Sequence, residues 1–337
     1  MSEKIIVALD AMGGDFAPIE TVKGAIEAIK VENSLHVSLV GREDAIQSEL
    51  AKYEYNKEQI SIVNATEVIE MAEPPVLAIR KKKDSSIVRA MQLVKEGKAD
   101  AFVSCGSTGA VLVGGQVLVG RIPGVERPPL APLIPTVDGF ALLIDCGANV
   151  DAKPSNLVQF AKMGSIYMKN IMGIENPRVG IVNIGAEEEK GNALVKETFP
   201  LLKACPDINF VGSVEAREIP YGAVDVIVCD AFVGNVILKL YEGVGGAFVK
   251  VMKASMMETA RGKIGGALVK PGMKKVMSKF TSSEYGGAPL LGLKGLVVKS
   301  HGNSTAVEVK ASILQCLEFK KNDINGKIRE SLSTSEL

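Results

Sequence analysis

Short apolar runs that alternate with amphipathic segments are the feature that most limits the folds open to this 337-residue chain. The runs are apolar on both faces, as strands inside a buried parallel sheet are. Strands are expected at residues 5–9, 37–40, 60–63, 101–104, 142–144, 179–183 and 226–229. Helices are expected at residues 18–30, 87–95, 107–119, 156–172 and 193–203. This alternation predicts a doubly wound, Rossmann-like α/β fold.

No repeat or low-complexity linker divides the chain, so residues 1–337 are expected to form a single α/β domain, with two intimately joined lobes as the alternative. The run PPLAPLIP at 128–135 breaks the helical pattern and predicts a crossing between lobes. A last strand at 295–299 and a helix at 305–319 are expected to return to the core.

Residues 247–280 differ from the rest because they are rich in Met and Lys and poor in acidic residues. This composition predicts a protruding pair of amphipathic helices, which we expect Pro271 to separate, with a glycine-rich turn between them. Met273, Val276, Met277 and Phe280 recur at i, i+3, i+4 and i+7, beside several lysines. Basic amphipathic helices bind lipid interfaces, so these four side chains are expected to contact a membrane. A dimer interface or core packing remains the alternative.

Composition excludes several classes of function. The formal net charge is zero and Trp is absent, which argues against a nucleic-acid partner. Five dispersed cysteines with only two histidines argue against a structural zinc site, and no metal is expected. The N-terminus lacks a signal-peptide pattern, and no apolar run reaches the length needed to span a bilayer. The protein is expected to be cytoplasmic, with at most peripheral membrane contact.

The loops that follow the predicted strands carry the candidate functional residues, because ligands of such folds bind at the carboxyl ends of the strands. The first loop is Asp10-Ala-Met-Gly-Gly-Asp15, in which Gly13 and Gly14 permit a tight turn. It is not the pattern G-x-G-x-x-G, so no NAD is inferred. The alternative is a plain strand–turn–helix with Asp15 near the helix cap.

The second loop, Ser104 to Gly109, places Ser107, Thr108 and Gly109 at a helix start, where they form either a phosphate cradle or an ordinary N-cap. No Lys-Ser/Thr pair follows, which excludes a Walker A loop. Four further loops hold the remaining candidates, namely Asn149, Lys190 with Asn192, Gly234 with Asn235, and His301 with Gly302 and Asn303.

Together the motifs Asp10-Ala-Met-Gly-Gly-Asp15, Asp145-Cys-Gly-Ala-Asn149, Glu188-Glu-Lys190-Gly-Asn192, Phe232-Val-Gly-Asn235 and Ser300-His-Gly resemble the bacterial phosphate acyltransferase family of phospholipid synthesis, in order and over essentially the whole chain. The sequence departs from that pattern at Ser107, Ala231 and Asn303, where Asn, Gly and Ser would be expected.

The resemblance implies transfer of a fatty acyl group from acyl carrier protein to inorganic phosphate. It also implies a fold related to isocitrate and isopropylmalate dehydrogenases and to phosphate acetyltransferase, a homodimer, and loose membrane association. The acyl-phosphate product would pass to a membrane-bound glycerol-3-phosphate acyltransferase. No cofactor is expected.

The chemistry of this reaction agrees with the residues. Phosphate is itself the nucleophile and a carrier thiolate is a tolerable leaving group, so donors that hold an anion and an oxyanion suffice. Lys190, Asn235 and His301 are expected to be catalytic, and the other loop residues named above are expected to bind substrate or phosphate. Cys105, Cys146 and Cys229 are expected to be packing residues.

Two alternatives to an acyltransferase remain at this stage. An NAD-dependent dehydrogenase on the related fold would need a carboxylate cluster for a metal, for which Asp225 and Asp230 are the available pair. A non-catalytic acyl-carrier or lipid-binding protein would retain acyl chains without forming a phosphate-dependent product.

Overall fold

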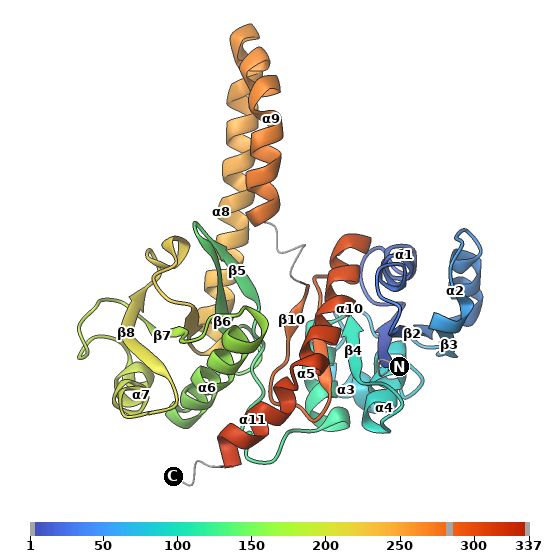
Figure 1. Cartoon of the computed structure of the whole chain (residues 1–337), viewed down its shortest axis with the longest axis horizontal. Coiled ribbons are helices and arrows are strands. Elements are labelled where there is room, and N and C mark those ends of the chain that lie inside the picture. Colours follow the sequence, from blue (N-terminus) through green and yellow to red (C-terminus); the bar gives the residue numbers. More distant parts are fainter. Residues whose placement is uncertain (1–3, 281–285, 334–337) are drawn as a thin grey trace.

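The structure is a computed structural model that describes residues 4–280 and 286–333. Its first lobe is built on a six-stranded sheet in the order β10-β11-β4-β1-β2-β3 (Figure 1). Its members are β1 (Ile5–Asp10), β2 (Leu35–Gly41), β3 (Ile60–Asn64), β4 (Ala101–Ser104), β10 (Ala288–Pro289) and β11 (Leu296–Lys299). All neighbours pair in parallel except β10, which is antiparallel to β11.

The second lobe is built on a five-stranded sheet in the order β5-β6-β9-β7-β8. Its members are β5 (Leu133–Thr136), β6 (Gly139–Ile144), β7 (Arg178–Asn183), β8 (Asn209–Glu215) and β9 (Val226–Val228). Only β5 is antiparallel to its neighbour. The sequence did not predict β5 or β8, and it predicted one wound sheet where the chain forms two.

Helices flank both sheets and begin where local signals place them. α4 starts after Ser85, whose hydroxyl accepts a hydrogen bond from the Val88 amide. α1 and α10 approach closely at Gly24, where a Cβ atom would lie 2.6 Å from Val309. The helices of the two lobes are α1 (Ile19–Ile29), α2 (Glu43–Leu50), α3 (Pro75–Lys81), α4 (Ser86–Lys95), α5 (Thr108–Gly114), α6 (Pro154–Ile171), α7 (Ala193–Lys203), α10 (Ala306–Lys321) and α11 (Ile324–Ser333).

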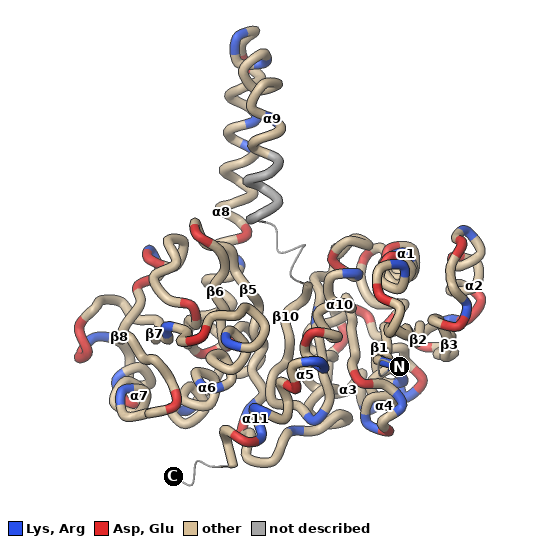
Figure 2. Tube along the Cα trace, in the orientation of Figure 1, with Lys and Arg blue, Asp and Glu red and all other residues tan. Residues whose placement is uncertain are grey.

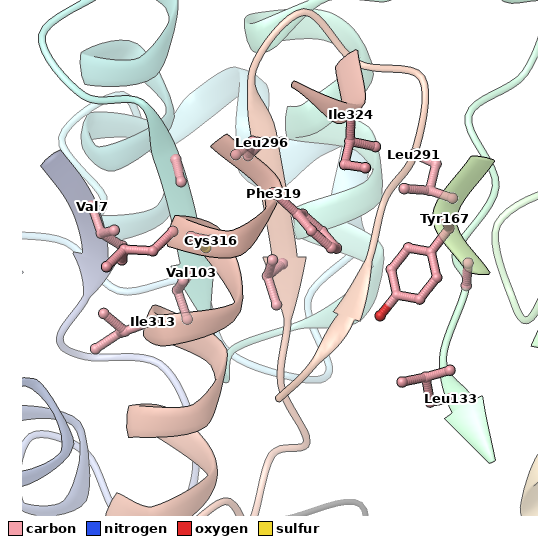
Figure 3. Packing of buried hydrophobic residues seen from close by; sticks show 14 of the residues in the cluster. Val7, Val103, Leu133, Tyr167, Leu291, Leu296, Ile313, Cys316, Phe319 and Ile324 are labelled. Carbon is pink, nitrogen blue, oxygen red and sulfur yellow. The ribbon is translucent and has the colours of Figure 1, made fainter. Parts of the chain in front are cut away.

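The predicted crossing between lobes, 128–135, bonds to both sheets. The Ala131 amide donates to the carbonyl of Pro289 in β10, and the Leu143 amide of β6 donates to the carbonyl of Pro132. One buried cluster also contains side chains of both lobes, and Tyr167 of α6 meets Phe319 of α10 edge to face at 5.4 Å between ring centroids (Figure 3). The α/β class predicted from the sequence is confirmed. The predicted strands and the predicted helices of the lobes are present to within three residues, where the π-helical turn Gly115–Val119 that follows α5 completes the helix predicted at 107–119.

A helical hairpin of α8 (Ala231–Glu258) and α9 (Ala260–Phe280) projects from the two lobes (Figure 1). The prediction that Pro271 would separate the helices is wrong, because Pro271 lies inside α9 and the chain reverses at Thr259. Thr259 is extended, and its hydroxyl accepts a hydrogen bond from the Gly262 amide, which caps α9. Gly262 serves close approach rather than a turn, since a Cβ there would lie 2.4 Å from the Met256 carbonyl.

The expectation that no apolar segment could span a bilayer is also wrong for α8. By length and composition alone it is long and apolar enough, with a mean hydropathy of 1.2 over its most apolar 18 residues. The window is 6 % buried within the protein. Glycine, alanine and valine are dispersed among its few charges, so the whole helix rather than a short run carries the apolar character.

Candidate active site at the strand ends

Three loops of the first lobe touch at the carboxyl ends of the neighbouring strands β1, β4 and β11. The Asp15 amide donates to the Gly302 carbonyl at 2.8 Å. Gly14 has φ +98°, and a Cβ there would lie 2.8 Å from both the Cys105 Cβ and the Gly302 carbonyl oxygen. Glycine is therefore required at position 14 by conformation and by space. Of the predicted residues, the fold brings Gly14, Asp15 and Gly302 into direct proximity.

Asp10 lies under these loops rather than on their surface. Its carboxylate accepts from the Ser104 hydroxyl at 2.6 Å, and Ser104 in turn accepts from the Gly106 amide at 2.9 Å. A Cβ at Gly13 would lie 2.3 Å from the same carboxylate. Burial raises the pKa of Asp10, although the hydrogen bond from Ser104 lowers it in part. These contacts give Asp10 a role in fixing the loop after β4.

Lys299 and Ser304 lie in the same place, and sequence reasoning missed both. Lys299 ends β11 opposite Ser104 of β4, and only 7 % of the residue is exposed. Its Nζ donates to the carbonyl of Ser300, and burial lowers its pKa. Ser304 is 6 % exposed, and its hydroxyl lies beside the Cys105 thiol without reaching hydrogen-bond geometry. A lysine that ends an apolar strand was the sequence signal that could have revealed Lys299.

The predicted phosphate cradle after β4 is partly an ordinary helix start. The Ser107 hydroxyl accepts from the Ala110 amide at 3.4 Å and caps α5. Gly109 faces Pro75 of α3, where a Cβ would lie 2.4 Å from the proline ring. Thr108 is exposed. The capping alternative therefore describes Ser107, and close packing accounts for Gly109.

In the second lobe, Asn149 holds a buried carboxylate. Asp145 follows β6 and is fully buried. Its two oxygens accept from the backbone amides of Leu130, Ala148 and Asn149 and from the Asn149 side chain, the last at 2.7 Å. The Asn149 amide also donates to the Pro128 carbonyl at 3.0 Å. Both donor positions of Asn149 are thus occupied by protein, which is a scaffold role rather than the predicted contact with phosphate.

Asn235 sits on the first turns of α8, directly after β9. Asp230 caps this helix by accepting from the amides of Phe232 and Val233 at 2.9 and 3.0 Å. Gly234 lets the helix approach Asp145, because a Cβ there would lie 2.0 Å from the Asp145 carbonyl oxygen. The half-buried Asn235 side chain makes no hydrogen bond to the residues that the structure describes. Its amide is available to a ligand.

Lys190 lies in the loop between β7 and α7, with its side chain 46 % exposed. It pairs with Glu187 at 2.8 Å, and this hydrogen-bonded pairing raises the pKa of Lys190. Asn192 accepts from the Val195 amide at 2.9 Å and so caps α7. Lys190 is therefore a charged, accessible donor at the end of β7, and Asn192 fixes the helix behind it.

His301 and Asn303 face solvent in the loop after β11. The His301 Nδ1 and the Asn303 Oδ1 atoms lie 2.6 Å apart, so the imidazole is oriented by its own loop. Across the lobes, Ala148 of the loop after β6 packs against the buried cluster that contains Ala110 of α5. The strand-end loops of the two lobes are joined at that point.

Two cavities lie away from these loops. One of about 310 Å³ is lined by Lys162, Lys169, Asn170, Asp207 and neighbours, and a second of about 510 Å³ is lined by Arg42, Asn64, Thr66 and neighbours. None of the predicted site residues lines either cavity. The site is therefore defined by the contacts of its loops.

The three cysteines at the strand ends are buried thiols. Burial raises the pKa of Cys105 to about 11 and that of Cys146 to about 12, and it raises the pKa of Cys229 as well. Thiols with such pKa values carry almost no thiolate at neutral pH. Within residues 4–280 and 286–333, no three His, Cys, Asp or Glu side chains are grouped to hold a metal ion.

Comparison with known proteins decides the family. Residues 5–327 match the family of fatty acid synthesis proteins. The chain belongs to this family. It is 51 % identical over 326 residues to the phosphate acyltransferase of Clostridium novyi, covering 97 % of this chain and 98 % of that protein. It is 50 % identical to the phosphate acyltransferase of Clostridium kluyveri, covering 96 % of this chain and 97 % of the other.

Solved structures support the fold. A phosphotransacetylase from Streptococcus pyogenes superposes with a TM-score of 0.62 at 18 % identity, covering 95 % of each chain. The EutD phosphotransacetylase from Staphylococcus aureus gives a TM-score of 0.60 at 16 % identity, covering 94 % of each. The resemblance drawn from the sequence motifs is thus confirmed, and the protein is an acyltransferase rather than the dehydrogenase or binding protein kept as alternatives.

Proposed function

We propose that the protein transfers a fatty acyl group from acyl carrier protein to inorganic phosphate. The curated relatives share its whole length and are named phosphate acyltransferases. The observation that carries the proposal is the contrast at the strand ends between available donors and buried, protonated thiols. A site with cationic and amide donors but no ready nucleophile suits a reaction in which the substrate phosphate attacks.

In this reaction a phosphate oxygen attacks the carbonyl carbon of the thioester and forms the carbon–oxygen bond of the acyl-phosphate. The carbon–sulfur bond then breaks. The carrier thiolate leaves and takes up a proton. Lys190, Asn235 and His301 act as donors to the oxyanion that develops on the carbonyl oxygen of the thioester. The Lys190 ammonium is charged at neutral pH, as a lysine normally is, and its hydrogen bond to Glu187 raises its pKa further.

The test supplies acylated carrier protein with and without phosphate and traps acyl-phosphate with hydroxylamine. Phosphate-dependent formation of hydroxamate, in equal amount to free carrier thiol, supports the proposal. Acyl-coenzyme A of the same chain length serves as the competing donor. Thiol release without hydroxamate would identify a thioesterase and contradict the proposal.

We propose further that the hairpin contacts a membrane at its tip. Met257 and Ile264 are exposed near the turn, and Figure 2 shows basic residues at the far end of the hairpin, where Arg261 and Lys263 lie. Each cation near an anionic lipid surface adds about 1 kcal/mol of attraction. Apolar and basic groups together at an outer end suit a peripheral contact by a cytoplasmic protein.

The four residues predicted for membrane contact belong to the end of α9 that is far from the tip of the hairpin. α9 begins at the hairpin turn and ends at Phe280 nearer the lobes, so Met273 lies well down the hairpin (Figure 1). The side chains of 274–280, with Val276, Met277 and Phe280, are outside the described residues. The liposome test therefore compares Ile264→Glu with Met277→Glu. Loss of binding to anionic vesicles only in Ile264→Glu supports a tip contact, and the reverse pattern restores the contact predicted for those four residues.

Exposed apolar side chains along α8 support two more parts of the proposal. Phe232, Val236 and Leu240 recur every four residues from the candidate site outward, and Val244 and Phe248 continue the ridge. We assign the first three to the acyl chain of the substrate and the last two to a homodimer contact. Phe248→Asp should give monomers in sedimentation with donor use intact, whereas Val236→Asp should weaken use of long-chain donors in an intact dimer.

The proposed product is a mixed anhydride of a fatty acid and phosphate. We place its use at a membrane-bound glycerol-3-phosphate acyltransferase that leads to phosphatidic acid, as the family resemblance implies. A membrane contact at the hairpin would shorten the path of a hydrolysable, lipophilic product. No nucleic acid takes part in this scheme.

A further inference from the structure

Lys299 is a buried cation whose surroundings in the protein are incomplete. Charged side chains this deeply buried are normally paired, because an isolated charge in the interior is very unfavourable. Within the described residues Lys299 forms no ion pair, and its recorded hydrogen bond goes to the carbonyl of the adjacent Ser300. Asp10 and Asp15 act on it only at longer range.

The position of Lys299 follows from strand register. Leu9, Val103 and Val298 align across β1, β4 and β11, so the residues that come next form a row at the sheet edge. That row is Asp10, Ser104 and Lys299. Asp10 and Ser104 bond to each other, whereas Lys299 makes no side-chain hydrogen bond to either of them.

A second observation points to the same spot independently. The Ser304 hydroxyl is buried and has no hydrogen-bond partner among the described residues. It belongs to the loop whose Gly302 carbonyl receives the Asp15 amide, so it lies within the contact of the three loops. Among the described residues, a buried hydroxyl without a hydrogen-bond partner and a buried ammonium without an ion pair thus lie within six residues of each other, and both suit the oxygen atoms of a phosphate group.

We propose that Lys299 and Ser304 bind the phosphate group that is acylated, with Lys299 as its principal counter-charge. This assignment rests on the proposed function and names the residues that hold the nucleophile, whereas Lys190 and Asn235 act on the thioester side. The same chemistry could bind the phosphodiester of the carrier's pantetheine arm. We commit to inorganic phosphate, and the experiment separates the two.

The experiment measures KM for phosphate and for acylated carrier protein in Lys299→Met and Ser304→Ala. Loss of a charged hydrogen bond should raise the phosphate KM roughly 10- to 100-fold in Lys299→Met, and loss of a neutral one about 2- to 10-fold in Ser304→Ala. The carrier KM should stay unchanged. Lys162→Met is the matched control, because Lys162 is equally buried but pairs with Asp207 at the far cavity.

A phosphate KM that stays at the wild-type value in Lys299→Met would overturn the assignment, and so would a rise confined to the carrier KM. Should Lys299→Met fail to fold, Ser304→Ala decides, since the Ser304 hydroxyl forms no hydrogen bond to any residue that the structure describes; an unchanged phosphate KM then counts against the proposal. Phosphate-dependent thermal stabilisation provides a readout independent of turnover. Stabilisation of wild type but not of Lys299→Met would support the site even if acyl-phosphate formation failed.

Discussion

Two buried charges lie at strand ends in the two lobes, and their surroundings differ. Asp145 in the second lobe receives four N–H donors from Leu130, Ala148 and Asn149. Lys299 in the first lobe has one backbone carbonyl and no ion pair among the described residues. A satisfied buried charge organises the loops around it, whereas an unsatisfied one is where a charged ligand is expected.

The loops around these two buried charges also differ in how accessible their side chains are. Around Asp145 the loops of the second lobe present accessible donors, Lys190 and Asn235. Around Lys299 the loops of the first lobe are crowded against one another at Gly13 and Gly14. In the proposed mechanism, the second lobe would supply groups that act on the thioester, and the first lobe would supply the anion site.

The largest effect is expected from the accessible donors. Lys190→Ala and Asn235→Ala should each lower turnover about 100- to 1000-fold, the usual cost of removing one donor to an oxyanion. Both side chains make few contacts, so the variants should remain folded. Acyl-phosphate formation at saturating phosphate measures the loss. Lys203→Ala, which breaks the exposed pair with Glu188 in the same lobe, is the control. Near-normal turnover in both variants would remove the second lobe from catalysis.

The next effect tests whether Asp145 is fully satisfied. Burial raises the pKa of Asp145 to about 6 in the folded protein, from 3.8. Below pH 3.8 the group is protonated in both states, and as the pH rises through 6 the folded protein must hold a buried carboxylate. Its contribution to the free energy of unfolding should therefore fall with rising pH, by up to about 3 kcal/mol.

Urea unfolding of wild type and Asp145→Asn across this pH range isolates that contribution. The difference in unfolding free energy, wild type minus variant, should decrease as the pH rises. A difference that grows with pH would mean that the four N–H donors outweigh burial. The Asp145 carboxylate would then be more fully stabilised by its surroundings than its pKa indicates, and the difference from Lys299 would be larger.

The crowded glycines should give smaller effects that are similar in both lobes. Gly13→Ala and Gly234→Ala place a Cβ at 2.3 and 2.0 Å from the nearest oxygen, and overpacking of this kind costs about 1–3 kcal/mol of stability. Gly245→Ala in the exposed middle of α8 meets nothing within 4 Å and should stabilise by up to about 1 kcal/mol. Thermal unfolding compares the three. Tolerance of alanine at position 13 alone would show that the first lobe is less tightly packed than the second.

The smallest effect on activity is expected from the cysteines of either lobe. Cys105→Ala and Cys229→Ala should retain most turnover, since burial raises both thiol pKa values and phosphate supplies the nucleophile. Mass spectrometry of enzyme quenched during turnover checks for an acyl-cysteine. An acylated Cys105 that disappears together with activity in the alanine variant would replace direct attack by a covalent mechanism in the first lobe.

Several functional features could be predicted from the sequence because they depend on neighbours along the chain. The apolar runs predicted β1, β4 and β7, and the glycines after them predicted the turns in which Asp15 and Lys190 lie. The order of the motifs was sufficient for the family. Helix starts such as Asn192 and Thr305 follow from local capping chemistry, which acts over three residues.

The rest was decided by contacts between segments far apart in sequence. Which polar groups are buried depends on β11 lying beside β4, about two hundred residues earlier in the chain. Lys299 at the end of β11 and Ser304 after it are both buried there. The same holds for Asn149, which the sequence predicted to bind phosphate. In the folded protein its side-chain amide donates to the Asp145 carboxylate and to the Pro128 carbonyl. Local sequence pattern determines where a helix or strand begins and ends. Whether a charged side chain is buried without a counter-charge is decided only when the strands pack against one another.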